Sequence, residues 1–155
     1  MTAVIDTPIQ DLPFVDEHMI GIEATERQTW DALLATLPDV FDRGYVGRVG
    51  SVLGVEHRDR RGDVGRIGST LPGFVVARAV PPAVLALLGQ HRFSRYALIF
   101  RIEKTNVGVR LRAETRAEFP GTKGRAYRGV VIGTRGHVLV TRRVLNAVKK
   151  AAERA

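Results

Sequence analysis

The clearest pattern in this chain is a strict alternation of small or apolar side chains with charged ones over residues 109–119. The first set is Val109, Leu111, Ala113, Thr115, Ala117 and Phe119, and the second is Arg110, Arg112, Glu114, Arg116 and Glu118. Successive side chains of a β-strand point to opposite faces of the sheet. The pattern therefore predicts a long strand with one dry and one ionic face. We expect Glu114 and Glu118 to be solvated and to pair with arginines across strands.

A helical period replaces this alternation near the C-terminus. Apolar or small side chains recur at helical spacing at Tyr127, Val130, Val131, Thr134, Val138, Thr141, Leu145 and Val148. This spacing predicts one long helix over residues 123–154, with its apolar stripe against the sheet. Four glycines within that range, between Gly124 and Gly136, are unfavourable in a helix interior. A helix that is kinked, or that starts late near Thr134, is the alternative.

The part of the chain before residue 109 predicts a strand, two short helices and a series of strands. Thr25 and Gln28 have the spacing of a capping box, in which each side chain binds the other residue's backbone amide. We expect Pro38 to end this first helix and a short second helix to cover residues 39–43. The predicted strands cover residues 14–23, 49–56, 64–71, 74–80, 83–88 and 95–104. A short helix after the Pro81-Pro82 pair is the alternative for residues 83–88.

Composition limits the class of protein. A chain of 155 residues fits one domain, which we place at residues 14–155 behind a loose leader over residues 1–13. There is no cysteine, which excludes disulfides and thiolate metal sites. No apolar run approaches the roughly 20 residues that span a bilayer. The leader has acidic residues but no lysine or arginine, unlike a secretory signal, so we expect a cytoplasmic protein.

The net charge of +8 raises the question of nucleic-acid binding. Arginine dominates the basic residues, and several arginines alternate with glutamates on the predicted strand. The ten aromatic residues do not interleave with arginine as a base-stacking platform would require. We therefore expect no specific nucleic-acid partner. A module with a solid core and a basic interaction surface remains the alternative.

The residues that carry chemistry form no recognisable catalytic or metal-binding motif. The histidines are His18, His57, His91 and His137, and none has the spacing of a zinc motif. No serine lies in a nucleophile elbow, and there is no phosphate-binding loop. We expect no metal and no cofactor, and the sequence identifies no catalytic residue. His91, near Tyr96 at the end of a strand, is the best candidate for a polar group at a cavity mouth.

The order of these elements resembles the helix-grip arrangement of the Bet v 1-like or START-like (SRPBCC) superfamily. The segment from Ile22 to Leu33, with a capping residue at Thr25 and an aromatic at Trp30, resembles its recurrent opening. The end of the chain, from Arg125 to Leu145, resembles the last helix of bacterial polyketide-cyclase-like members. The resemblance implies an α+β fold. In that fold a curved seven-stranded antiparallel sheet wraps around a long C-terminal helix, two short helices follow the first strand, and a cavity lies between sheet and helix.

The superfamily includes carriers of lipids, sterols, hormones and polyketides as well as polyketide cyclases and dehydratases. The resemblance therefore favours a non-catalytic protein that binds a small apolar or amphipathic molecule, with a cyclase or dehydratase as the alternative. By their phase on strands and helix, the expected lining residues are Tyr96, Leu98, Phe100, Leu111, Ala113, Thr115, Ala117, Tyr127, Val130, Val131 and Thr134, with His91 at the mouth. A solid core is the competing possibility for the same residues.

Overall fold

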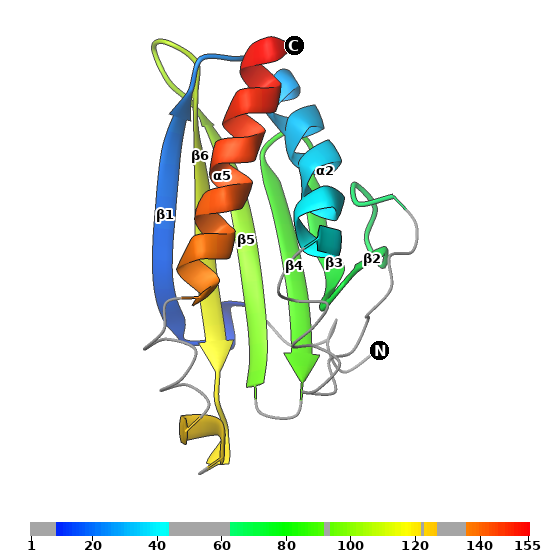
Figure 1. Ribbon diagram of the computed structural model, residues 1–155, viewed down its shortest axis with the longest axis vertical. Coiled ribbons are helices and arrows are strands. Elements are labelled where there is room, and N and C mark those ends of the chain that lie inside the picture. The colour runs from blue at the N-terminus through cyan, green and yellow to red at the C-terminus, as the bar shows by residue number, and fades with distance from the viewer. Residues whose placement is uncertain (1–8, 44–62, 92–93, 122, 127–135) are drawn as a thin grey trace.

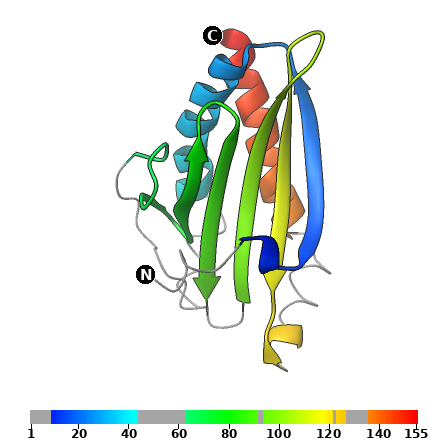
Figure 2. The same ribbon diagram turned by 180° about the vertical axis from the view of Figure 1, so that it is seen from behind.

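The computed structural model describes residues 9–43, 63–91, 94–121, 123–126 and 136–155. The helical elements are η1 (Ile9–Asp11), α2 (Glu26–Arg43) and α5 (Gly136–Arg154). The strands are β1 (Phe14–Ile22), β2 (Thr70–Leu71), β3 (Phe74–Val80), β4 (Val84–His91), β5 (Ser94–Lys104) and β6 (Val109–Glu118). The strands form one antiparallel sheet in the order β1-β6-β5-β4-β3-β2. Helices α2 and α5 lie side by side on one face of this sheet, which we call the inner face (Figure 1). In the part of the chain that the structure describes, the outer face carries the short η1 and no long helix (Figure 2).

The predicted strands are largely confirmed, with one correction. The strand predicted over residues 83–88 is confirmed as β4, which covers Val84–His91, in place of the alternative short helix. The strand predicted over residues 64–71 is corrected. Residues 64–69 form turns, and only Thr70–Leu71 of the predicted strand is extended. Gly68 has a φ of 89° there, which favours glycine and interrupts a strand. The predicted strand over residues 49–56 lies outside the described residues. Within the described part of the chain the sheet therefore has six strands, and the expected count of seven is not matched.

Helix α2 corrects the prediction of two short helices. It continues through Pro38 as one helix of 18 residues. Proline removes one hydrogen bond from a helix interior. The apolar stripe nevertheless continues past it, because Leu33, Leu37 and Phe41 are each at most 1% exposed. Burial of this stripe against the sheet outweighs the local cost of the proline. The capping box at the start of the helix is confirmed, since the Gln28 amide donates to Thr25 Oγ1 and the Thr25 amide to Gln28 Oε1, both at 3.0 Å.

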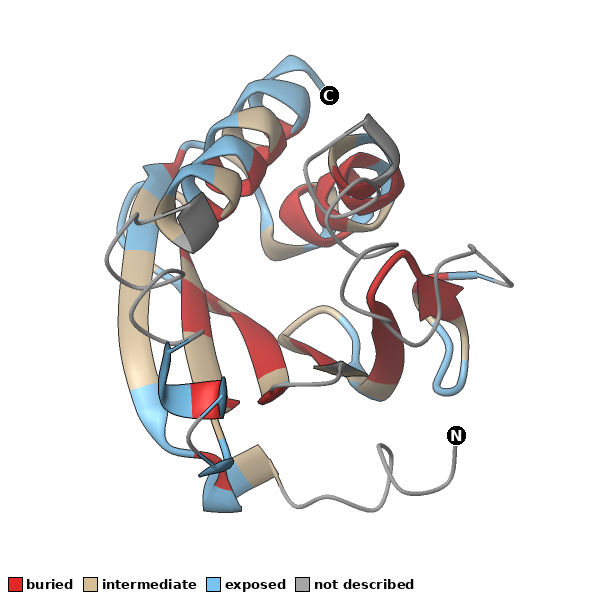
Figure 3. Ribbon diagram, turned by 60° about the horizontal axis from the view of Figure 1, so that its bottom comes forward, coloured by how far each residue is buried: buried red, intermediate tan, exposed pale blue. Residues whose placement is uncertain are grey.

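The main core lies between the helices and the inner face. Val144, Leu145 and Val148 of α5 are at most 3% exposed and belong to the same buried cluster as the inner-face side chains. The buried sides of α2 and α5 face each other and the curved sheet (Figure 3). Residues 123–126 are helical, and residues 127–135 of the predicted long helix lie outside the described residues.

The end of α5 is tied to the end of β1. Lys149 Nζ donates to the Gly21 carbonyl at 2.9 Å, and the Glu23 amide donates to Glu153 Oε1 at 3.0 Å. The Glu153 carboxylate also pairs with Lys149 at 2.7 Å. A hydrogen bond from Lys149 and another from the Glu23 amide lower the pKa of Glu153. These contacts place the C-terminal turn of α5 beside the β1 edge of the sheet.

A second, smaller core covers part of the outer face. Val75, Leu88, Ala97 and Ile99 are each at most 2% exposed, on strands β3, β4 and β5. Leu12, just before β1, packs into the same cluster. The alternation of dry inner and wet outer positions predicted for β6 therefore does not extend to the central strands, which are apolar on both faces.

Candidate functional site

Four residues of the predicted lining lie at the centre of the inner face. Leu98 and Phe100 on β5 and Leu111 and Ala113 on β6 are at most 6% exposed and belong to the main core. Phe100 lies directly opposite Ala113, and Leu98 opposite Thr115. Small residues on β6 thus face larger ones on β5 in this part of the inner face.

Tyr96, Thr115 and Ala117 form the next positions along the same face. Tyr96 lies opposite Ala117, which is 7% exposed, while Tyr96 and Thr115 are half-buried. The Tyr96 hydroxyl donates to the Gly73 carbonyl at 2.8 Å. Its ring packs edge-on against Phe74 at 5.2 Å. Tyr96 is therefore held in place by the sheet, and its hydroxyl already has a backbone acceptor.

The remaining predicted lining residues cannot be placed with these. Tyr127, Val130, Val131 and Thr134 lie outside the described residues. His91 is the last residue of β4, and its backbone pairs with Ser94 of β5. Its side chain is likewise outside the described part of the structure.

The inner face also carries a polar pair that the sequence analysis did not select. Asp16 Oδ2 and His18 Nε2 lie 3.3 Å apart, and about a quarter of each side chain is exposed, 24% and 22% respectively. In the register of β1 with β6, Asp16 lies opposite Thr115 and His18 opposite Ala113. Both side chains are therefore on the inner face, beside two residues of the predicted lining.

The alternation of side chains along the first strand could have predicted the position of this pair. Ile20 and Ile22 both pack into the main core, so alternation places residues 18 and 16 on the same side. Beyond Asp16 a β-bulge shifts the register and Phe14 lies opposite Arg116, an outer-face residue. This irregularity made the alternation of the segment imperfect and obscured its phase.

The outer face carries the predicted ion pairs, which are confirmed as cross-strand contacts. Arg112 on β6 donates to Glu17 of β1 at 2.6 Å and to Glu103 of β5 at 2.9 Å. Hydrogen bonds from Arg112 to both glutamates raise the pKa of the arginine. Arg95 and Glu118 form another pair between β5 and β6. These contacts link the strands β1, β6 and β5 across the outer face of the sheet.

Glu114 corrects the expectation that all these glutamates are solvated. It is 6% exposed and pairs with Arg116 on its own strand and with Arg101 of β5 at 2.7 Å. Burial raises the pKa of Glu114, but the hydrogen bonds and positive charges of Arg116 and Arg101 together lower it by more. The net pKa lies below the ordinary value of 4.5. Leu12 contributes to this environment, because its carbonyl accepts a hydrogen bond from Arg116 at 3.0 Å.

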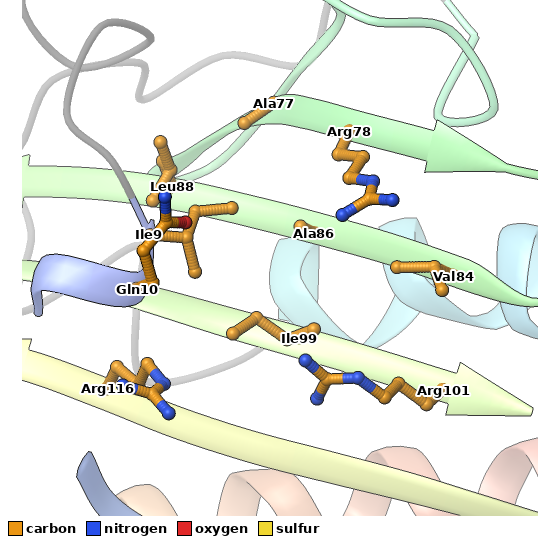
Figure 4. Close-up of a pocket in the computed structure, with 10 residues that line it drawn as sticks. All are labelled: Ile9, Gln10, Ala77, Arg78, Val84, Ala86, Leu88, Ile99, Arg101 and Arg116. Atoms are coloured by element: carbon orange, nitrogen blue, oxygen red, sulfur yellow. The ribbon is translucent and has the colours of Figure 1, made fainter.

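A pocket of about 370 Å³ lies beside Glu114 on the outer face (Figure 4). Its floor consists of apolar side chains of β3, β4 and β5, and its edge carries three arginines. The lining residues are Ile9, Gln10, Ala77, Arg78, Val84, Ala86, Leu88, Ile99, Arg101 and Arg116. The guanidinium groups of Arg78 and Arg101 point toward the floor around Ala86 and Ile99 (Figure 4). The volume falls within the range of small-molecule sites, roughly 300–1,000 Å³. The sequence analysis did not identify this pocket.

Two further observations concern the described residues only. Across these ranges, no group of three or more histidine, aspartate or glutamate side chains is arranged to hold a metal ion. No helix in the same ranges is long and apolar enough to cross a membrane.

Comparison with known proteins identifies the fold. No protein-family model and no curated protein sequence matches this chain. Among solved structures, an uncharacterised protein from Rhizobium leguminosarum matches with a TM-score of 0.58 at 15% identity, over 90% of this chain and 94% of the other. Protein Ms6760 from Mycobacterium smegmatis matches with a TM-score of 0.55 at 9% identity, over 89% and 96%.

A third match is StfQ, the di-domain ARO/CYC protein of the steffimycin biosynthetic pathway. Its TM-score is 0.56 at 13% identity. The match covers 94% of this chain and 52% of StfQ, about half the length of that protein. At these identities the likeness concerns the fold, a sheet with a C-terminal helix packed on it.

Proposed function

We propose that this protein is a member of the helix-grip superfamily and binds a small apolar or amphipathic molecule between the sheet and the C-terminal helix, without catalysing a reaction. The observation that carries the proposal is the gradient of burial along the inner face. Phe100, Leu111 and Ala113 are fully buried at 0% exposure. Tyr96 and Thr115, further along the same strands, are only half-buried, and the small Ala117 opposite Tyr96 is 7% exposed. A small ligand would pack against this less buried end, where β6 contributes small side chains.

The polar groups at this end would orient an amphipathic ligand. Binding pockets combine an apolar lining with a few polar groups that fix the ligand's direction. Asp16 and His18 supply such groups from the edge strand β1, beside Thr115 and Ala113. The similarity in fold to one half of an aromatase/cyclase supports a binding role of this kind, and it does not identify the ligand.

The experiment is native mass spectrometry of the protein purified from its source, followed by denaturing extraction of any bound molecule. We expect a stoichiometric apolar adduct. Titration of the stripped protein with the extracted molecule would then be followed by the fluorescence of Trp30, the only tryptophan, which is buried in the main core. A clean apo mass together with no saturable binding of a series of fatty acids and aromatic polyketide analogues would overturn the proposal.

A matched pair of variants locates the site. Ala117→Leu places a larger side chain on the inner face, and we expect it to weaken binding by about tenfold because it fills ligand space. Val107→Leu also enlarges an apolar side chain, by one methylene group, in the β5–β6 turn, where Val107 is 78% exposed, and should leave binding unchanged. Equal effects of the two variants would place the ligand elsewhere.

The second candidate is a cyclase or dehydratase acting on an aromatic or polyketide substrate, and the Asp16–His18 pair favours it. When Asp16 accepts the hydrogen bond from His18 Nε2, the other ring nitrogen has a free lone pair and can accept a proton from a substrate. The test is incubation with a polyketide thioester analogue and detection of the loss of water by mass spectrometry. Turnover that His18→Asn abolishes, with ligand binding retained, would favour the enzyme over the carrier.

A further inference from the structure

We infer that the outer-face pocket is a second binding site, which takes a single amphipathic anion: a molecule with an apolar body and a carboxylate or phosphate group. This site is separate from the one proposed on the inner face. The pocket has an apolar floor and an excess of positive charge around it, and a local backbone irregularity positions one of its arginines.

The pocket combines two kinds of surface that an amphipathic anion needs. Ala86, Leu88 and Ile99 form an apolar floor and are at most 2% exposed. Arg78 and Arg101 direct their guanidinium groups over this floor from opposite sides (Figure 4). Guanidinium groups bind carboxylates and phosphates with paired hydrogen bonds. An apolar body on the floor and a negative group between the arginines would satisfy both.

Among the described residues of the outer-face strands, the charges are unbalanced around this pocket. Elsewhere on the described outer face, arginines and glutamates balance: Arg95 pairs with Glu118, and Arg110 and Arg112 pair with Glu17 and Glu103. The lining of the pocket contains Arg78, Arg101 and Arg116, and Glu114 is the carboxylate that pairs with the last two. Three positive charges and one negative charge leave a net charge of +2 there.

Of the three pocket arginines, Arg78 is the one with no acidic partner among the described residues. Arg101 uses Nη1 for Glu114, and Arg116 uses Nε for Glu114 and Nη1 for the Leu12 carbonyl. Each of these two guanidiniums keeps further N–H donors, because arginine has five. A ligand anion would therefore meet one uncommitted guanidinium and the remaining donors of two others.

A β-bulge in β3 directs Arg78 to this face. Phe74 and Val76 point to the inner core, so strict alternation would also direct residue 78 inward. The register of β3 with β4 shifts between Val76 and Arg78, and Arg78 then lies opposite Ala86, a residue of the pocket floor. Such bulges re-aim side chains within a strand. The same shift returns Ala79 to the inner core. The bulge thus keeps a charge out of the core and places it at the pocket.

The test is an NMR titration of the methyl-labelled protein with decyl phosphate, with decanol as the uncharged probe and inorganic phosphate as the anion without a tail. We expect decyl phosphate to shift the methyl signals of Ala86, Leu88 and Ile99, and the two control probes to bind at least about tenfold more weakly. Inner-face methyls such as Leu111 and Val148 report separately on the other proposed site. Shifts confined to the inner face would overturn this inference and would leave the inner-face proposal intact.

A pair of arginine variants separates the site from general charge. Arg78 is exposed, so Arg78→Gln should not unfold the protein, and we expect it to weaken decyl phosphate binding by about tenfold through loss of a charge-assisted hydrogen bond. Arg110→Gln removes the same charge from the same face outside the pocket and should change affinity by less than about twofold. Equal losses in the two variants would overturn the inference. So would binding to anionic vesicles in the absence of binding to monomeric decyl phosphate.

Discussion

The ring of Tyr96 lies directly across Gly89 on the neighbouring strand. The two residues are opposite each other in the β4–β5 register. A Cβ atom on Gly89 would come within 2.2 Å of Tyr96 Cε2 and within 2.2 Å of the Gly73 carbonyl oxygen. That carbonyl is also the acceptor of the Tyr96 hydroxyl. The absence of a side chain at residue 89 therefore allows the ring to reach its hydrogen-bond partner and to pack against Phe74.

This relationship predicts that Gly89→Ala is strongly destabilising. The methyl group would displace the Tyr96 ring, break its hydrogen bond and disturb its contact with Phe74. We expect a loss of about 2–3 kcal/mol in the free energy of unfolding, measured by urea denaturation. The control is Gly21→Ala, because no atom lies within 4 Å of a Cβ at that strand position. Similar losses for the two variants would show that strand propensity, and not the ring, is responsible.

The capping box predicts a smaller effect at the start of α2. Thr25→Ala removes the acceptor of the Gln28 amide, and such losses cost about 1 kcal/mol. Thr25→Ser keeps the hydroxyl group and should retain most of the stability. Thermal unfolding followed by circular dichroism would compare them. A Tm for Thr25→Ser as low as that for Thr25→Ala would show that the threonine methyl group, and not the hydrogen bond, is what matters.

The buried position of Glu114 predicts a dependence of stability on pH. Its pKa is lower in the folded protein than the ordinary value of 4.5, because the hydrogen bonds and positive charges of Arg116 and Arg101 together outweigh its burial. A carboxyl group with a lowered pKa stabilises the fold above its unfolded pKa. This contribution is lost as the pH falls from the unfolded toward the folded pKa. We expect the free energy of unfolding to decrease as the pH falls below about 5.

The variant Glu114→Gln isolates this contribution. At pH 7 it should reduce the free energy of unfolding by about 1–2 kcal/mol, because two arginines lose a charged acceptor and both remain partly exposed. The difference from the unsubstituted protein should shrink as the pH falls. Urea denaturation at pH 7 and pH 3 measures both. A difference that stays constant with pH would exclude the titration of Glu114 as its cause.

Local patterns in the sequence determined the elements with strong periodicity. The alternation from Val109 to Phe119 predicted β6 to within one residue, because a strand's period of two depends only on the residues themselves. The spacing of Thr25 and Gln28 predicted the capping box, which is also a local contact. The break expected at Pro38 was wrong, because burial of Phe41 by distant strands outweighs a local preference.

Only the tertiary structure decided which faces several charged residues occupy. The bulge in β3 places Arg78 on the outer face, the bulge in β1 turns Phe14 away from the face that carries Asp16, and each depends on pairing with a neighbouring strand. Glu114 is buried through contacts with Arg101 and Arg116 that involve a second strand. A single-residue shift in register reverses the face of every side chain beyond it. The sequence by itself determined the described elements with strong local periodicity, such as β6 and the start of α2, while cross-strand register and packing decided the length of α2 and where the polar groups and the outer pocket lie.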